Sequence, residues 1–109
     1  MVDRRAVALS GIAVAAVLFA AEAATRGDPA NGARLAERWC AACHVVSPQQ
    51  QHASADAPPF SVIGQRPDFS AEGLAFFLME PHPKMPSMSL TRQEAADLAA
   101  YIVSVSGQR

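Results

Sequence analysis

Lysine, tryptophan and tyrosine are almost missing from this chain of 109 residues, which contains one residue of each kind. The formal net charge of −1 excludes the strongly basic composition with which nucleic-acid-binding domains attract phosphates. No stretch alternates apolar and polar residues as a half-buried strand would, and no strand–helix–strand pattern is present. Large apolar residues are few, and chains of this size often need a metal, a cofactor or a disulfide to complete their core.

The first 23 residues have the pattern of a secretory signal peptide. Arg4 and Arg5 give a basic start, the run Ala6–Ala21 is uncharged and apolar, and small residues around Glu22 form a cleavage site ending at Ala23. The run has 16 residues, fewer than the ~20 that span a bilayer. We therefore predict a signal peptide at 1–23, export to the periplasm and a mature domain at 24–109, with a retained membrane anchor as the alternative.

A first helix is predicted to begin at Asp28-Pro29, because aspartate caps helices and proline suits the first helical position. Small and apolar residues at spacings of three and four then mark one face of this helix: Gly32, Leu35, Ala36, Trp39 and Cys43. The segment Val45–Pro59 has no periodicity and is predicted to be a loop, to which the sequence assigns no role. One short helical turn is predicted at Phe60–Ile63.

Two further helices follow. Ser70 is the predicted cap of the second, and Pro81 is predicted to stop it. Its apolar stripe consists of Leu74, Phe77 and Leu78. Three prolines within residues 81–86 then require an extended loop.

The last helix is predicted to begin at a capping box, Thr91–Glu94, with Leu90 packed against it, and to end at Gly107. Its buried stripe consists of Leu98, Ile102 and Val105. The predicted fold class is therefore all-α, with three main helices and long loops. Long loops in a compact domain need something to wrap around.

The sequence Cys40-Ala41-Ala42-Cys43-His44 carries the strongest chemical signal, because Cys-x-x-Cys-His is the attachment pattern for c-type haem. Two thiols at this spacing can add to the two vinyl groups of one porphyrin. The next residue then places an imidazole under the iron, and alanine at both intervening positions lets the backbone approach the macrocycle. We predict that Cys40 and Cys43 bind one haem covalently and that His44 ligates its iron.

Three other interpretations of this segment compete. A thioredoxin-type redox pair, suggested by Trp39 before Cys40, needs a preceding strand and a mixed α/β chain, and neither is visible. A zinc site that adds His52 or His82 to the motif lacks a second closely spaced ligand pair. A structural disulfide between Cys40 and Cys43 would close a very small loop and stabilise little.

A six-coordinate iron would need a second protein ligand, and five side chains are candidates. Thioethers and imidazoles both serve as axial ligands of haem, although methionine in a small core usually packs and lone histidines are usually surface groups. The candidates are His52, Met79, His82, Met85 and Met88.

The chain resembles the class I bacterial cytochromes c over nearly all of Asp28–Gly107. The resemblance is carried by Gly32 ahead of the haem motif, Pro58-Pro59-Phe60, Lys84-Met85-Pro86, and a capped final helix with Ala100-Tyr101-Ile102. It implies a cytochrome c fold wrapped around one haem, with Met85 as the sixth ligand.

The same resemblance implies two structural contacts. Gly32 lets the first helix cross the last closely, near Leu98 and Tyr101, and a backbone carbonyl in the Pro58–Pro59 region binds the ring of His44. The sequence departs from the family at Ala36, where many members carry a large aromatic residue. We expect Trp39 to compensate for it.

These observations predict a one-electron carrier with one covalent haem c whose iron lies between His44 and Met85, and not an enzyme. A six-coordinate iron offers no open position to a substrate. The alternatives are a haem enzyme or gas sensor with a labile sixth ligand, and a membrane-tethered haem subunit of a respiratory complex. The expected partners are redox proteins, such as a dehydrogenase and an oxidase or another membrane electron-transfer complex, with no nucleic acid. The expected state is a monomer.

Overall fold

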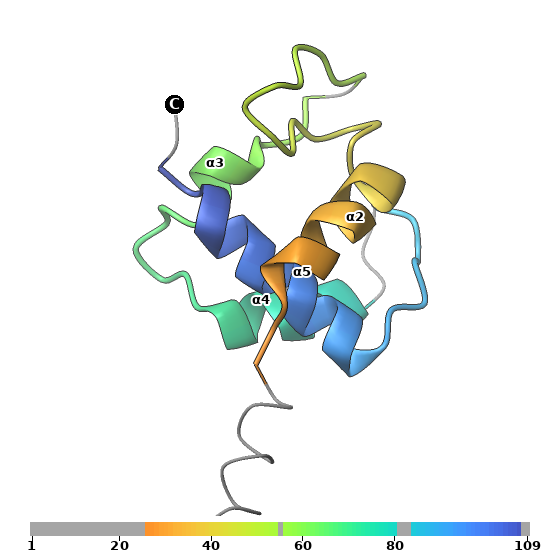
Figure 1. The fold of residues 1–109 in the computed structure, drawn as a ribbon, viewed down its shortest axis with the longest axis vertical. Coiled ribbons are helices and arrows are strands. Elements are labelled where there is room, and N and C mark those ends of the chain that lie inside the picture. The colour runs from red at the N-terminus through yellow and green to blue at the C-terminus, as the bar shows by residue number, and fades with distance from the viewer. Residues whose placement is uncertain (1–25, 55, 81–83, 108–109) are drawn as a thin grey trace, which may run out of the picture.

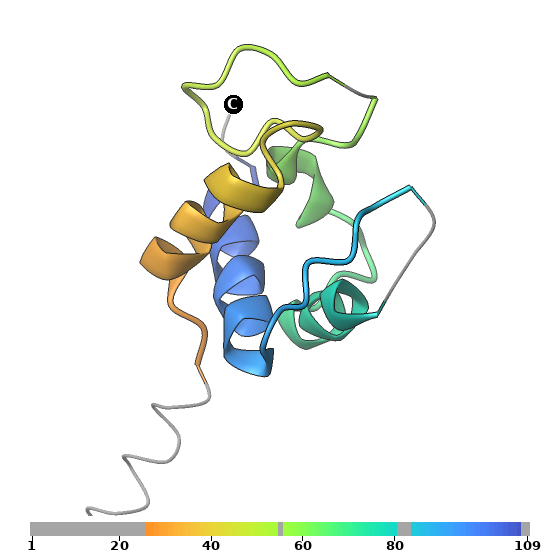
Figure 2. The same cartoon turned by 90° about the vertical axis from the view of Figure 1, so that its right-hand side faces the viewer.

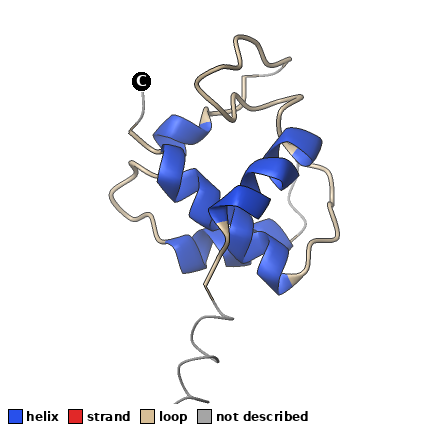
Figure 3. Ribbon diagram, in the orientation of Figure 1, coloured by secondary structure: helices blue, strands red, loops and turns tan. Residues whose placement is uncertain are grey.

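The computed structural model describes residues 26–54, 56–80 and 84–107, and within these ranges every regular element is a helix (Figure 3). The helices follow one another as α2 (Pro29–Trp39), α3 (Phe60–Ile63), α4 (Ala71–Met79) and α5 (Arg92–Val105). Long loops join them (Figure 1). The all-α prediction is confirmed. The predicted signal peptide, Pro81 and His82 lie outside the described residues.

The three predicted helix caps are confirmed by hydrogen bonds. The side chain of Asp28 accepts from Ala30 N at 2.9 Å, and Ser70 Oγ accepts from Gly73 N at 3.0 Å. Thr91 Oγ1 accepts from Glu94 N at 3.1 Å. Each bond satisfies a backbone donor that has no partner within the first turn of its helix.

The predicted ends are also close to those observed. The short turn has the predicted bounds, Phe60–Ile63. The last helix ends at Val105, two residues before Gly107, which adopts a φ of 84° that favours glycine. The N–H of Gly107 donates to Ser61 O at 2.9 Å, so the end of α5 is joined to α3.

α2 crosses α5 with its backbone in direct contact, and Figures 1 and 2 both show the two helices side by side. A Cβ atom at Gly32 would overlap the carbonyl oxygen of Asp97 and lie 2.7 Å from Tyr101 Cβ. Only glycine permits this approach. The crossing implied by the family resemblance is confirmed, with Asp97 and Tyr101 as the nearest residues of α5.

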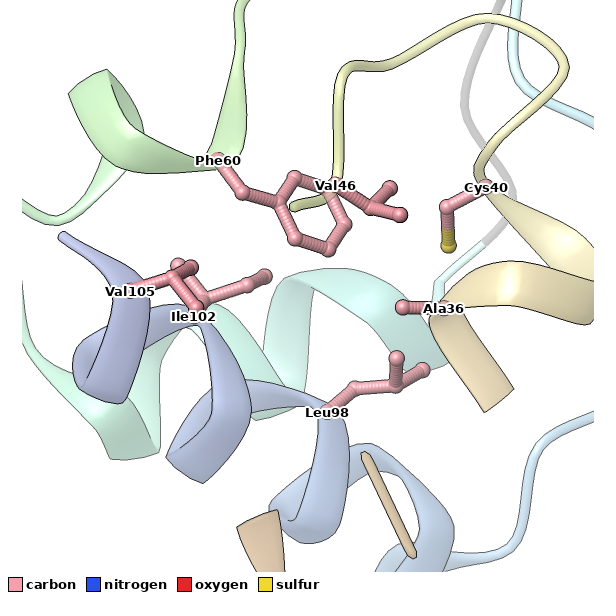
Figure 4. Packing of buried hydrophobic residues seen from close by; sticks show 7 residues of the cluster. All are labelled: Ala36, Cys40, Val46, Phe60, Leu98, Ile102 and Val105. Atoms are coloured by element: carbon pink, nitrogen blue, oxygen red, sulfur yellow. The ribbon is translucent and has the colours of Figure 1, made fainter. Parts of the chain in front are cut away.

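A small apolar core fills the space between the crossing helices, α3 and the start of the 45–59 loop (Figure 4). Its buried members are Ala36, Cys40, Val46, Phe60, Leu98, Ile102 and Val105. The buried stripe predicted for α5 is confirmed. The Phe60 ring occupies the centre of the cluster, so the sequence contributes one large aromatic residue to it.

The expectation that Trp39 compensates for Ala36 is wrong. The Trp39 side chain is 40% exposed, and the guanidinium of Arg38 lies 5.0 Å from the centre of its ring. Ala36 is fully buried and makes the crossing tight without a large residue. Cys43 is exposed as well, because α2 ends at Trp39 and the chain turns before it reaches the cysteine.

α4 is packed less completely than α2 and α5. Leu74 and Leu78 are half-buried against the core, as predicted. Phe77, the third member of the predicted apolar stripe, is 49% exposed, and Phe76 is 67% exposed. No helix in the described part of the chain combines the length and apolar character needed to cross a membrane.

Candidate haem attachment site

The attachment motif is a tight turn that continues from the end of α2. The carbonyl oxygen of Cys40 accepts from Cys43 N at 3.1 Å and from His44 N at 2.8 Å. This turn brings both cysteines and the histidine to one end of the helix. The sequence spacing is therefore realised as a single local structure.

The two cysteines have different surroundings. Cys40 is buried, and its sulfur points into the core beside Ala36 (Figure 4), whereas Cys43 is exposed. Both are free thiols. Burial, and to a smaller extent the nearby Cys43, raises the pKa of Cys40 to about 11. In the chain without an attached group, Cys40 is therefore a neutral thiol at pH 7.

The competing interpretations of the motif find no support in the structure. Cys40 and Cys43 form no disulfide, and a helix, not a strand, precedes them. In the ranges that the structure describes, no three His, Cys, Asp or Glu side chains lie close enough together to hold a metal ion. His82, one of the residues considered for a zinc site, is outside those ranges.

His44 is held by the loop that follows it. Its Nδ1 lies 2.6 Å from the carbonyl oxygen of Pro58, which confirms the contact implied by the family resemblance. A carbonyl oxygen only accepts, so Nδ1 carries the proton and Nε2 keeps a lone pair available for a metal. The rings of Phe60 and His44 lie 5.4 Å apart, and Phe60 N donates to Val45 O at 3.0 Å.

This donor set fits a covalently attached haem. Two free thiols lie three residues apart in one turn, and the adjacent imidazole offers its Nε2 to iron while Nδ1 is bound to a carbonyl. An outer hydrogen bond of this kind fixes the ring orientation of a metal-ligating histidine and increases its basicity.

The candidates for the second ligand differ in position. Met85 and Met88 are both half-buried in the segment before α5, whereas Met79, on α4, and His52 are exposed. His82 is not described. The 84–90 segment and the end of α2 lie on either side of α5 in Figure 2.

Sequence reasoning missed Asp97, which is 3% exposed. Its carboxylate accepts from Asp28 N and Asn31 Nδ2, each at 2.7 Å, and from Gln93 Nε2 at 2.8 Å. Burial alone would raise the pKa of Asp97, but these hydrogen bonds outweigh it and lower the pKa below its ordinary value of 3.8. Asp97 joins the start of α2 to α5.

Tyr101 makes a second connection that the sequence did not reveal. Its hydroxyl donates to Val46 O at 2.7 Å, and its ring packs edge-on against Phe60 at 6.3 Å. Burial, together with the charge of Glu37, raises the pKa of Tyr101 above its usual value. The hydroxyl therefore stays protonated and ties α5 to the chain just after the motif.

Comparison with known proteins agrees with this site. The pattern of the family described as Cytochrome c matches residues 29–106. The chain is 56% identical to cytochrome c-552 of Bradyrhizobium diazoefficiens over 92 residues. These residues make up 84% of this chain and 88% of the relative. No solved structure matches the chain. The chain belongs to the cytochrome c family, whose members are electron carriers with covalent haem c and not enzymes.

Proposed function

We propose that the protein is a periplasmic carrier of one electron, with the iron of a single haem held between His44 and Met85. The observation that carries this proposal is the 2.6 Å contact between His44 Nδ1 and Pro58 O, because it leaves Nε2 as the ring nitrogen for iron. When bound, the haem supplies the exchange of one electron between ferric and ferrous iron.

The chain's own residues would attach and orient this group. Cys40 and Cys43 would fix the porphyrin at two points. Pro58 O would make the imidazole of His44 a better electron donor, which stabilises the ferric state and lowers the potential. Phe60, buried beside that imidazole, would keep water from this side of the ligand.

We favour Met85 over Met88 for two reasons. Met85 directly precedes Pro86, as in the class I cytochromes c that the chain resembles. It also follows Lys84, whose left-handed φ of 79° turns the chain immediately before the proposed ligand.

Substitution of each methionine tests the sixth ligand. Met85→Ala should abolish the weak sulfur-to-iron charge-transfer band of the oxidised protein, lower the reduction potential and allow carbon monoxide to bind the reduced form. Met88→Ala is the matched control and should leave the band in place. The reverse pattern would assign the role to Met88.

The same spectra test the first alternative function. A haem enzyme or gas sensor would bind carbon monoxide readily as the wild-type protein, whereas a carrier with a firm Met85 ligand should not. N-terminal sequencing of the exported protein tests the second alternative. A chain beginning at Ala24 supports a cleaved signal peptide, and an intact leader would make this a membrane-tethered haem subunit.

The proposed partners are redox proteins, such as a dehydrogenase and an oxidase, that meet the monomer near the haem edge. In residues 24–109 the seven basic and eight acidic residues are interspersed along the chain, so long-range electrostatic steering should be modest. Ala42 and Pro86 are exposed and Met88 is half-buried, which offers a small apolar contact. Met88→Lys should slow electron exchange more than Arg92→Ala does.

A further inference from the structure

The 45–59 loop folds back over the attachment motif (Figure 1). Ser54 N donates to Ala42 O at 2.8 Å, and Ser54 Oγ also donates to that oxygen. Carbonyl groups at the end of a helix lack partners within the helix and need them from elsewhere. The loop supplies these partners, so it is part of the site's structure.

The side chain of Gln50 makes four further bonds to backbone groups. Its Oε1 accepts from Val46 N at 3.0 Å, and its Nε2 lies 2.9 Å from each of three carbonyl oxygens, those of Ala41, His44 and His52. The amide has two N–H groups, so one of them is shared between two carbonyls. Only this orientation of the amide gives each backbone group a partner of the correct kind.

Three of the four bonded groups lie on either side of His44 along the chain, and the fourth is the carbonyl of His44 itself. Ala41 precedes it within the motif, Val46 follows it, and His52 belongs to the part of the loop that leads to Pro58. One side chain therefore joins the turn that presents His44 to the loop that presents the carbonyl of Pro58. Without this connection, the 2.6 Å contact between Nδ1 and Pro58 O would depend on the Ser54–Ala42 bonds and on the loop ends.

We infer that Gln50 is a positioning residue for the axial histidine, because its amide holds the loop whose Pro58 carbonyl binds the ring of His44. This inference rests on the proposed ligation of iron by His44. A short bond from Nδ1 to a carbonyl makes the imidazole more basic and favours ferric iron. Loosening the loop weakens that bond and raises the reduction potential.

Gln51 provides a matched control. It is the next residue in the same loop, it is exposed, and its side chain has no hydrogen bond to any described residue. Gln50→Leu removes all four bonds, and Gln50→Glu keeps an acceptor for Val46 N but loses both donors. Gln51→Leu makes the same chemical change outside the network. Glutamate has nearly the same shape as glutamine. If Gln50→Leu does not yield holoprotein, proton exchange in Gln50→Glu therefore tests the proposal.

The experiment measures the midpoint potential, thermal unfolding and proton NMR spectrum of each holoprotein. In the oxidised wild-type protein, the ring protons of His44 should be strongly shifted by the iron. In Gln50→Leu the midpoint potential should rise, and in both Gln50 variants the Nδ1 proton of His44 should exchange with water several-fold faster. Gln51→Leu should change neither quantity.

The experiment distinguishes a failure of the proposed function from a failure of the role proposed for Gln50. Unshifted ring protons in the wild-type protein would contradict ligation by His44, and thus the proposed function itself. Shifted ring protons, with an unchanged potential in Gln50→Leu and unchanged exchange in both Gln50 variants, would overturn the role of Gln50 alone. A lower unfolding temperature without those two changes would show that Gln50 only stabilises the loop.

Discussion

The crossing of α2 with α5 and the half of the molecule formed by α4 and residues 84–90 are built differently. At the crossing, glycine meets backbone, a buried carboxylate accepts three hydrogen bonds, and Ala36 and Leu98 are fully buried. In α4 no residue is fully buried. Lys84 and Ser89 adopt left-handed conformations, which cost non-glycine residues free energy.

This difference shows which contacts the polypeptide supplies by itself. At the crossing, the described buried polar side-chain atoms are paired, and Ala36 and Leu98 are covered by the polypeptide alone. α4 presents apolar side chains that the chain covers only in part, such as Phe77. In a cytochrome c, a covalent haem adds a large apolar surface to the core, so we expect the stability of this half to depend on the haem far more than that of the crossing.

The largest effect is expected from removing the attachment thiols. The double variant Cys40→Ser, Cys43→Ser should lack covalent haem, detected as loss of haem peroxidase staining after denaturing electrophoresis. It should also lose most of its helical circular dichroism, because a group that binds only the native state stabilises it. Any remaining amide protection should lie at the α2–α5 crossing. A fully helical apoprotein that unfolds cooperatively would contradict this prediction.

A methyl group placed in the crossing tests its tightness. Gly32→Ala should destabilise the holoprotein by about 3 kcal/mol, because the added Cβ overlaps the backbone of Asp97 and the helices must separate. Urea unfolding measures this cost. In α4, Gly73→Ala is the control, because the nearest atom to its Cβ is Ser70 Oγ at 2.7 Å, a side chain that can move. It should change stability by less than about 1 kcal/mol. Equal effects at both positions would remove the distinction between the two regions.

The buried carboxylate gives the crossing a dependence on pH. Asp97→Asn should cost about 2 kcal/mol at pH 7, because one of the three donors then faces an N–H group. Asp68→Asn, an exposed aspartate between α3 and α4, should change stability little.

The sign of the pH effect follows from the lowered pKa of Asp97. Its contribution is fully present above the ordinary value of 3.8 and is lost as the pH falls through the lower folded value. Urea unfolding at pH 7 and pH 3 should therefore show a smaller loss of stability in Asp97→Asn than in the wild type. A wild-type loss that the substitution leaves unchanged would show that other carboxylates are responsible.

The smallest effect is expected in the 84–90 segment. Lys84→Gly should be more stable than Lys84→Ala by up to about 1 kcal/mol, because only glycine adopts a φ of 79° without a steric cost, while its greater freedom in the unfolded chain offsets part of the gain. The comparison with alanine removes the effect of losing the lysine charge. Thermal unfolding of the two holoproteins measures the difference, and equal midpoints would show that this conformation is not costly.

Features that depend on neighbours in sequence could be predicted. The caps Asp28, Ser70 and Thr91 each bond within three residues, and the motif from Cys40 to His44 is a single turn, so their residue types and spacing carried the necessary information. The contact of Pro58 with His44 came from the family resemblance. The choice between Met85 and Met88 remains a prediction.

Features that depend on distant parts of the chain could not be predicted. Asp97 bonds to the start of α2, 69 residues away, and in sequence it resembles any other acidic residue. Gln50 is the middle of three consecutive glutamines, and nothing in that run distinguishes it. Trp39 was expected to compensate for Ala36, because helical periodicity does not show where the helix ends or what packs against its last turn.

The row of rings formed by His44, Phe60 and Tyr101 bears on the speed of electron exchange. Electron transfer is fast when the ligand sphere moves little as the charge on the metal changes, a quantity called the reorganisation energy. Phe60 is buried against the histidine ring, and Tyr101, fixed through its hydroxyl to Val46 O, supports Phe60 from behind. With Nδ1 bound to Pro58 O, the imidazole has little room to tilt. As the proposed iron ligand, His44 would be preorganised in this way, which would keep the reorganisation energy small.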